Sequence, residues 1–247
     1  YNKLKIFKTI LKNKMHIFIV PYRNREKQLS NFNKIMVPIL EKDIGEYQIW
    51  YIHQTDKKMF NRGALLNIGF LIAKEKYPEY YLEITYVFHD IDIWPTTFNV
   101  INYNTINGVV YHPYGEKLIE LGGSLGCFCV FKGIDYLRIN GHPNYYGWGS
   151  EDVCISRRCK IIGVVINENN FIHRRTNNQI IDVPSDDLPS QIQFKIICNN
   201  RNYLEVKKEN HARSRNGLSN LKFKIISKKR YKETPKLKMF NVEFDVI

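Results

Sequence analysis

The feature that most constrains the fold is a regular alternation of apolar runs and amphipathic stretches over residues 16–88. Apolar runs at residues 16–20, 47–53 and 86–88 predict buried strands. Between them, residues 26–40 and 61–76 carry apolar side chains at three- and four-residue steps, which is the spacing of amphipathic helices. Strand, helix, strand, helix, strand in this order predicts an α/β fold built on a sheet of parallel strands.

The second half of the chain is less regular. A glycine pair at residues 122–123 precedes an apolar strand at residues 124–131, and a loop rich in glycine and aromatic residues spans residues 141–150. A short helix is expected at residues 151–160, and further strands at residues 161–166, 194–198 and 221–226. Residues 176–190 are polar and contain prolines, which predicts a mobile loop. No repeat or linker divides the chain, so we expect one domain over residues 1–247.

Length and composition place the chain among globular proteins. It has 247 residues, of which 44% are hydrophobic and 13% aromatic, enough to bury a substantial core. No apolar run approaches the roughly 18 residues needed to cross a bilayer, so we expect no membrane span in this chain. Residues 1–14 lack the apolar core of a signal peptide. The chain does not begin with methionine, which leaves room for an N-terminal anchor that was removed.

The net charge of +13 would suit a nucleic-acid-binding protein. Lysine, asparagine, isoleucine and tyrosine are all abundant, however, and this joint bias is expected of an AT-rich genome, which would scatter lysine over the surface. Basic residues gather late, at Lys207-Lys208 and Lys228-Lys229-Arg230, but no nucleic-acid motif accompanies them. Nucleic acid is therefore not an expected partner.

The five cysteines make an odd count. Cys127 and Cys129 flank Phe128 in a predicted strand and would point the same way, as buried free thiols rather than zinc ligands. The chain also contains no Asn-x-Ser/Thr glycosylation site. Together these features favour a reducing compartment, such as the cytoplasm of a cell or of a virus-infected host.

The third predicted strand runs into two carboxylates, Asp90 and Asp92, and the run is closed by Pro95. Where a strand gives way to a turn, carboxylates spaced by one residue can approach one hard cation. A cation held by one or two carboxylates keeps coordination positions for substrate phosphate oxygens. Ligands of open α/β sheets bind beyond the carboxyl ends of the strands, so the position of this pair favours a nucleotide-sugar site.

Three further segments supply groups that such a site needs. Arg23 and Arg25 follow the first strand and can fork onto phosphate or uracil oxygens. Phe60 and Arg62 lie just ahead of the second helix and offer an aromatic face for a base and another cation. Residues 147–152 combine a tryptophan ring, a permissive glycine backbone and a carboxylate pair.

In this combination and order, the motifs resemble those of the β-1,4-galactosyltransferase family, glycosyltransferase family seven. The matching segments are FIVPYRNR at residues 18–25, FNRGALLNIGF at 60–70, HDID at 89–92, GWGSED at 147–152 and NGLSNL at 216–221. The resemblance covers residues 17–226 and implies a GT-A type nucleotide-diphospho-sugar transferase fold, with a mostly parallel central sheet flanked by helices. His89 and His112-Pro113 are most similar to the branch that adds galactose to xylose on proteoglycan linkers.

Carried over residue by residue, the resemblance implies a role for each motif. The implied donor-binding residues are Pro21, Arg23 and Arg25 at the uridine and phosphates, Phe60 at the uracil, Arg62 at phosphate or base, Asp90 at the ribose or sugar, and Gly123 and Trp148 at the sugar. Asp92 and His173 would bind the metal, with Asn170 as a further candidate ligand. Trp148, Glu151 and Asp152 would contact the acceptor, and Asp152 would be the catalytic base.

The implied reaction is an inverting transfer from a UDP-sugar, with galactose as the preferred donor sugar, to a hydroxyl of a carbohydrate or glycoconjugate, giving a β-linkage. One base acts on the acceptor and a cation on the leaving diphosphate. Residues 16–110 would form the nucleotide-binding half and residues 111–247 the acceptor and catalytic half, after an extension at residues 1–15. If an N-terminal anchor was removed, the Golgi lumen is the alternative compartment.

Three positions depart from the family pattern. Vertebrate lactose-type enzymes have methionine where this chain has Asn170, and the xylose branch has a second histidine where this chain has Arg175. Manganese is the expected ion, with magnesium as the alternative, because an amide oxygen suits a harder cation. Glu120 replaces a tyrosine that helps to select galactose. The alternatives are therefore UDP-GalNAc, UDP-GlcNAc or UDP-glucose as donor, or a non-catalytic sugar- or nucleotide-binding module.

Overall fold

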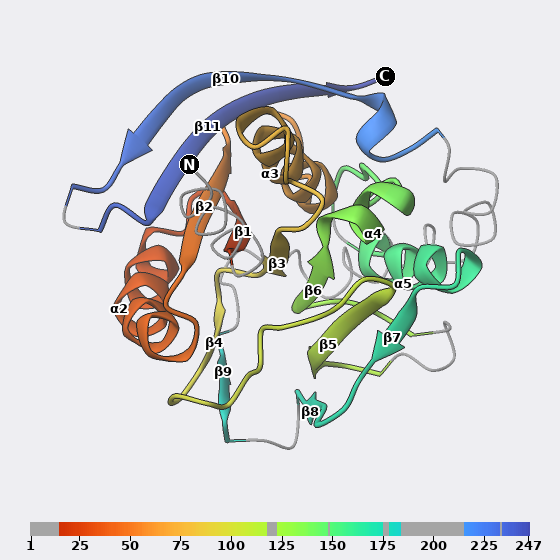
Figure 1. The fold of residues 1–247 in the computed structure, drawn as a ribbon. Helices are drawn as coiled ribbons and strands as arrows, with labels where there is room; N and C mark the ends of the chain where they lie inside the picture. The colour runs from red at the N-terminus through yellow and green to blue at the C-terminus, as the bar shows by residue number, and fades with distance from the viewer. Residues whose placement is uncertain (1–14, 118–122, 148, 175–177, 184–214, 233) are drawn as a thin grey trace, which may run out of the picture.

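The computed structural model of this chain describes residues 15–117, 123–147, 149–174, 178–183, 215–232 and 234–247 (Figure 1). Its strands are β1 (His16–Tyr22), β2 (Tyr47–Gln54), β3 (Thr85–His89), β4 (Ile93–Pro95), β5 (Val109–Gly115), β6 (Phe128–Lys132), β7 (Val165–Asn167), β8 (Ile172–His173), β9 (Ile180–Asp182), β10 (Leu221–Arg230) and β11 (Leu237–Val246). Its helices are α2 (Glu26–Asp43), α3 (Arg62–Lys76), α4 (Gly133–Arg138) and α5 (Glu151–Ile161), with a 3-10 turn at Leu218–Asn220.

One mixed sheet organises these elements, in the order β10-β11-β2-β1-β3-β6-β5-β7, with β8 paired to β5. The centre of the sheet is parallel, since β1 pairs in parallel with both β2 and β3, and β2 with β11. Antiparallel pairing joins β10 to β11 and places β6 between β3 and β5. The predicted parallel α/β core is confirmed, and antiparallel strands extend it on both sides.

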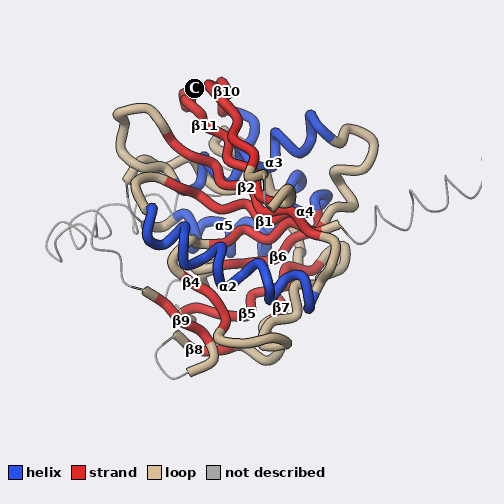
Figure 2. Tube along the Cα trace, turned by 90° about the vertical axis from the view of Figure 1, so that its left-hand side faces the viewer, coloured by secondary structure: helices blue, strands red, loops and turns tan. Residues whose placement is uncertain are grey.

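The core lies on both faces of this sheet, because alternate side chains of a buried strand point in opposite directions. Ile17 and Ile19 of β1 pack on the face covered by α3, whereas Phe18 and Val20 pack on the face covered by α2. Figure 2 shows α2 lying across the strands on the face turned toward the viewer. Each of these fully buried side chains contributes roughly 1.5–3 kcal/mol to folding.

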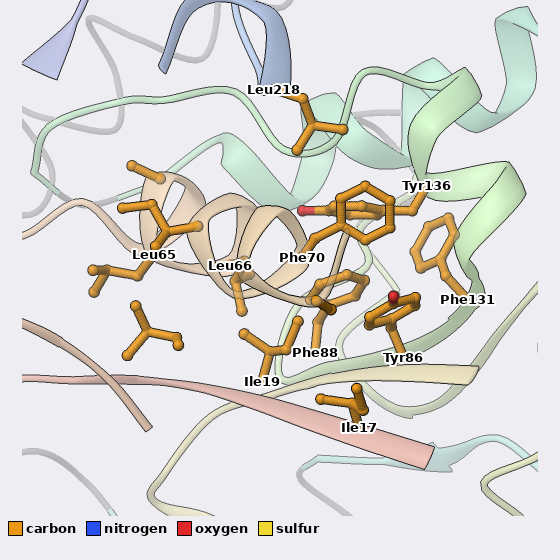
Figure 3. Close-up of a cluster of buried hydrophobic side chains, with 14 of the residues drawn as sticks. Ile17, Ile19, Leu65, Leu66, Phe70, Tyr86, Phe88, Phe131, Tyr136 and Leu218 are labelled. Atoms are coloured by element: carbon orange, nitrogen blue, oxygen red, sulfur yellow. The ribbon is translucent and has the colours of Figure 1, made fainter. Parts of the chain in front are cut away.

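The α3 face carries a dense aromatic cluster, shown in Figure 3. Phe70 of α3 lies above Tyr86 and Phe88 of β3, and the rings of Phe88 and Tyr136 stack with centroids 4.1 Å apart. Helix α3 also packs directly on β1, because a Cβ at Gly69 would lie 2.4 Å from Cγ2 of Ile19. The helix that leads out of the predicted donor site is therefore held rigidly against the sheet.

Several elements differ from the sequence-based expectation. The strand expected at residues 124–131 begins only at Phe128, because Cys127 adopts a left-handed backbone conformation with φ 64°. Cys127 is therefore half-buried and outside the strand, unlike the buried Cys129, and the prediction that both thiols lie in one strand was wrong. The strand expected at residues 161–166 begins at Val165.

The polar stretch at residues 176–190, predicted as a mobile loop, contains the strand β9 (Ile180–Asp182), which pairs with β4. The sequence-based analysis did not identify β5, α4 or β11. The strand expected at residues 194–198 lies outside the described residues.

The described cysteines are all free, and Cys198 lies outside the described part of the chain. Among the described residues, no helix is both long and apolar enough to cross a membrane.

Candidate active site

The predicted site residues gather at one edge of the parallel strands. The register of β1 with β3 ends at Ile19, whereas β1 continues beside β2 to Tyr22, so Pro21 lies past the last β1–β3 pair. The N-termini of α2, α3 and α5 lie at Glu26, Arg62 and Glu151, immediately after or within the predicted motifs. Strand ends and helix N-termini meeting in this way are suited to an anionic ligand.

Arg62 joins two of the motifs. Its Nε donates to Oδ1 of Asp90 at 2.6 Å, and its Nη1 lies 3.5 Å from Oε1 of Glu151. The Arg62 side chain is 14% exposed, and its buried Nη1 has no hydrogen-bond partner among the described residues. Asn61 fixes the start of α3, because its side chain accepts a hydrogen bond from the amide of Ala64 at 2.9 Å. The HDID, FNR and GWGSED motifs thus converge on one guanidinium.

The carboxylates around Arg62 have raised pKa values. Burial raises the pKa of Asp90, although Arg62 opposes the shift. Burial and the neighbouring Asp152 raise the pKa of Glu151 to about 7. Burial lowers the pKa of Arg62, but the charges of Asp90 and Glu151 raise it by more, so the pKa of Arg62 is raised overall. The site therefore concentrates buried acidic groups around one buried cation, an arrangement that is typical of functional sites.

Asp92 lies two residues beyond Asp90 and makes a second, weaker contact with a cation. Its Oδ2 is 3.4 Å from Nη1 of Arg25, and its side chain is 21% exposed. Burial, followed by the charge of Asp90, raises the pKa of Asp92 to about 6. A partly exposed carboxylate whose cationic neighbour is 3.4 Å away favours an added positive charge.

Asp152 occupies the first turn of α5. Its Oδ2 accepts a hydrogen bond from Oγ of Ser124 at 2.5 Å, and its backbone carbonyl accepts from the amide of Leu125 at 3.0 Å. Ser150, the residue before α5, adopts φ 73°, which turns the chain sharply into the helix. The proposed base is thus held by the segment that follows Gly123.

Phe60, which is expected to stack on the base, lies beside Arg23, whose guanidinium carbon is 5.3 Å from the centre of the Phe60 ring. Arg23 also donates to the backbone carbonyl of Lys58 at 2.7 Å. Burial lowers the pKa of Arg23. A cation and an aromatic face are therefore adjacent, as the sequence predicted for a nucleotide-binding surface.

The predicted metal ligands are not assembled into a cluster. Within the described residues, no three His, Cys, Asp or Glu side chains form a group that could hold a metal. His173 lies on the short strand β8, opposite Gly115 of β5, and is exposed, as is Asn170. Asp92 fits a divalent cation by its chemistry and its raised pKa, whereas the placement of His173 and Asn170 leaves their role a prediction.

One acidic residue near the predicted metal site was missed. Asp182 lies opposite Ile93 in the β4–β9 pair, and its charge contributes to the raised pKa values of both Asp90 and Asp92. It is held by Arg174, whose Nη2 donates to Oδ1 at 2.9 Å, and by the Tyr114 hydroxyl at 3.1 Å. No pattern marked it in the sequence, because it lies in a polar stretch without apolar periodicity.

A buried polar network that positions the loop before α5 was also missed. The Asn67 side chain of α3 donates to the carbonyl of His142 at 2.8 Å and accepts from the Tyr136 hydroxyl at 2.6 Å. The buried Arg158 of α5 donates to the carbonyls of Gly141 and Asn216, both at 2.6 Å. Two signals in the sequence could have found Asn67: it stands among apolar helix residues, and it belongs to the segment FNRGALLNIGF. Trp148 lies outside the described residues, and Gly123 is described with φ +93°.

Comparisons with known proteins agree with the motif order. Residues 8–104 match the family model described as the N-terminal region of glycosyl transferase group 7. Mouse β-1,4-galactosyltransferase 1 is 29% identical over 218 residues, covering 86% of this chain and 51% of the mouse protein. Mouse β-1,4-galactosyltransferase 4 is 36% identical over 142 residues, covering 54% of this chain and 39% of that protein. The chain is similar in sequence to the β-1,4-galactosyltransferases.

The fold of the chain is also similar to that of a solved β-1,4-galactosyltransferase. A solved structure of a mutant Drosophila β-1,4-galactosyltransferase 7, in complex with manganese, UDP-Gal and xylobiose, matches with a TM-score of 0.73 at 21% identity. The match covers 94% of this chain and 95% of that chain. The predicted GT-A type fold is therefore confirmed. The chain spans about half, or less, of the length of the curated relatives named above.

Proposed function

We propose that this protein is a metal-dependent inverting glycosyltransferase that moves galactose from UDP-galactose to a hydroxyl of a carbohydrate or glycoconjugate. The observation that carries the proposal is the bridge from Asp90 through Arg62 to Glu151, beside Asp152, at the carboxyl edge of β3. In a relative of the β-1,4-galactosyltransferases, this bridge joins the motifs proposed for the donor to the one proposed for the acceptor.

The donor is proposed to bind across the ends of β1, β2 and β3. Arg23 and Phe60 would hold the uracil and its phosphates, supported by their 5.3 Å contact, with Pro21 and Arg25 alongside. Asp90 would accept hydrogen bonds from the ribose or the sugar while Arg62 neutralises it. The nucleotide-binding half is accordingly proposed at residues 16–110, and the acceptor and catalytic half at residues 111–247.

Asp152 is the proposed base. The acceptor hydroxyl would give its proton to Oδ2 as its oxygen bonds to the anomeric carbon, and the bond from that carbon to the diphosphate would break. The Ser124 hydroxyl, which donates to Oδ2 at 2.5 Å, holds this oxygen in place and yields to the acceptor. One-step displacement inverts the configuration and gives a β-linkage from an α-linked donor.

Asp92 and His173, with Asn170 nearby in sequence, are the residues proposed to hold a divalent cation, manganese rather than magnesium. When bound, the cation neutralises charge on the leaving diphosphate. The raised pKa of Asp92 supports this assignment, because a buried carboxylate gains from a neighbouring cation. Manganese is favoured because the solved complex of the Drosophila enzyme contains it.

The compartment is a separate proposal. The comparisons do not support the cytoplasmic setting that the cysteines favoured, so we propose the lumenal alternative considered from the sequence.

A screen of UDP-sugars tests the proposal. UDP-galactose, UDP-GalNAc, UDP-GlcNAc and UDP-glucose are each incubated with the protein in Mn²⁺ or Mg²⁺, and UDP release is measured with and without carbohydrate acceptors. We expect UDP-galactose with Mn²⁺ to give the highest rate. If no donor turns over and UDP with Mn²⁺ leaves the melting temperature unchanged, the enzyme proposal fails. UDP binding without turnover would instead favour a non-catalytic binding module.

A further inference from the structure

A cavity of about 310 Å³ lies next to the proposed base. Its lining includes Lys117, Gly123, Ser124, Ser156, Lys160 and Glu168. Ser124 connects the cavity to the proposed base, because this lining residue donates its hydroxyl to Asp152 Oδ2. The cavity is therefore separated by one hydrogen-bonded residue from the carboxylate that is proposed to take the acceptor proton.

One face of α5 forms a wall of this cavity. Asp152, Ser156 and Lys160 are spaced by four residues, so their side chains project from the same side of the helix. Ser156 and Lys160 lie one and two turns beyond Asp152, about 6 and 12 Å along the helix axis. A ligand that reaches Asp152 can therefore extend along Ser156 toward Lys160.

Ser156 is the lining residue whose surroundings most favour binding of a ligand. The residue is 0% exposed, and its Oγ has no hydrogen-bond partner among the described residues. A buried unpaired hydroxyl lowers stability unless something binds to it. The hydroxyl lies 3.2 Å from where a Cβ of Gly123 would be, and Lys160 Nζ lies 3.7 Å from the same point. The absence of a side chain at Gly123 thus leaves space in front of both groups.

Lys117 and Glu168 add charged groups to the lining, and contacts hold both in place. Lys117 Nζ lies 3.2 Å from Oε2 of Glu168, and Glu168 Oε1 lies 3.4 Å from Nδ1 of the buried His112. His112 is anchored in turn by a contact of its Nε2 with the carbonyl of Gly126 at 3.1 Å. Glu168 is thus held from two sides, which keeps Lys117 at the cavity.

We propose that this cavity is an acceptor subsite that binds an acidic saccharide, one that carries a carboxylate or a sulfate ester. The inference rests on the proposed function, since it takes Asp152 as the base that receives the acceptor hydroxyl. Two lysines and one glutamate line the cavity, so its wall carries a net positive charge. The Ser156 hydroxyl adds a donor for an anionic or hydroxyl oxygen.

Charge also fixes the direction in which the ligand lies. The Asp152 carboxylate, which is hydrogen-bonded to the lining residue Ser124, would repel an anionic group placed near Ser124. The anionic group therefore lies at the Lys160 end, one to two helical turns from the reacting hydroxyl. This separation selects acceptors whose charge is remote from the hydroxyl that is glycosylated.

Measuring how tightly the full chain binds three sugars tests this proposal. Glucose, glucuronate and glucose 6-sulfate are compared by saturation-transfer NMR titration, with UDP and Mn²⁺ present and absent. The expected result is that glucuronate or glucose 6-sulfate binds on the order of tenfold more tightly than glucose. The carboxylate and sulfate probes then identify which acidic group the cavity takes. Inorganic sulfate serves as a fourth probe, and binding as tight as that of the charged sugars would show a simple anion site and overturn the proposal.

Substitutions at Lys160 and Ser156 show whether these two residues cause the binding of charged sugars. Lys160→Gln should reduce the ratio of charged to neutral sugar affinity toward one, whereas Lys224→Gln, an exposed lysine on β10, should leave the ratio unchanged. Ser156→Ala should weaken sugar binding without lowering the melting temperature, because it removes an unpaired buried hydroxyl. A purely structural Ser156 would give the reverse pattern, with a lower melting temperature and unchanged binding, and would count against the subsite.

The outcomes separate this inference from the proposed function. If UDP-sugars are hydrolysed in Mn²⁺ but the three sugars bind alike, the acidic subsite is wrong and the enzyme proposal stands. If charged sugars bind more tightly through Lys160 but no UDP-sugar is turned over, the cavity binds acidic saccharides and the proposed function is wrong. Equal binding of all sugars in wild type and Lys160→Gln overturns the inference in either case.

Discussion

At the scale of single residues, the site depends on where each charge is placed relative to Arg62. Asp90 and Glu151 share this guanidinium, at 2.6 and 3.5 Å, whereas Asp152 is held by Ser124 at 2.5 Å. Asp152 therefore has a different partner from Asp90 and Glu151. This difference leaves Asp152 able to accept a proton while its neighbours remain bound to a cation.

Asp152→Asn tests the assignment of the base. We expect the transfer rate to fall by roughly 10² to 10⁴, because the amide cannot accept the acceptor proton. The Mn²⁺-dependent dissociation constant of UDP, measured by calorimetry, should stay within about twofold of wild type. Glu243→Gln, an exposed carboxylate change on β11, is the matched control and should alter neither value. A parallel loss of UDP binding in Asp152→Asn would show that Asp152 serves the donor instead.

Asp92→Asn tests whether the pKa of Asp92 is raised in the folded state and whether that shift lowers stability at neutral pH. The folded state keeps the Asp92 proton up to about pH 6, whereas the unfolded state releases it near its ordinary value, so this group lowers the free energy of unfolding as the pH rises through that window. Without metal, the variant should be more stable than wild type at pH 7.5 by roughly 1–3 kcal/mol. The two proteins should be equally stable near pH 4.

Urea unfolding in EDTA at both pH values measures this difference. Asp245→Asn, with a side chain 78% exposed, is the control and should change stability by less than about 0.5 kcal/mol. Mn²⁺ with UDP should raise the melting temperature of wild type at pH 7.5 but not that of Asp92→Asn. A variant less stable than wild type at pH 7.5 would contradict the raised pKa.

At the scale of elements, the start of α3 is the part that positions the site. A Cβ at Gly63 would lie 2.1 Å from the carbonyl oxygen of Pro143, so this turn packs directly against the loop that precedes α5. Gly69, two turns later, makes an equally close approach to Ile19 of β1. The helix therefore touches the site loop at one end and the sheet at the other.

Gly63→Ala and Gly69→Ala form a matched pair. Each should destabilise the fold by about 1–3 kcal/mol through overpacking, although alanine favours a helix over glycine. Only Gly63→Ala should also weaken UDP binding per folded molecule, because it displaces the neighbouring Arg62 from Asp90. Thermal unfolding and UDP titration measure the two effects. Equal UDP binding in both variants would show that the start of α3 does not position the donor site.

The elements that could be predicted from the sequence are those with a strong apolar pattern. β1, β2, β3, α2 and α3 were found because each buries a continuous run or a regular stripe. β9 was missed because its register with β4, Ile93 opposite Asp182, depends on a long-range partner rather than on local periodicity. The start of β6 was predicted too early, because the left-handed backbone at Cys127 interrupts an otherwise apolar run.

At the scale of the whole molecule, the sheet brings together residues that are far apart in the chain. Arg62 and Glu151 belong to separate motifs, and their meeting was predicted only through the resemblance to a known family. Ser156 and Glu168 carry no motif, and their place in one cavity depends on how α5 packs beside β5 and β7. The sequence therefore marked the motifs that meet at Arg62, but not the residues that line this cavity.

The most direct measurement of the central claim is the product formed from UDP-galactose in the presence of Mn²⁺ and a carbohydrate acceptor. NMR of that product reports both transfer and the configuration of the new bond. We expect a β-linked galactoside that forms in Mn²⁺ and does not form in EDTA. An α-linked product, or transfer that is unaffected by EDTA, would contradict it.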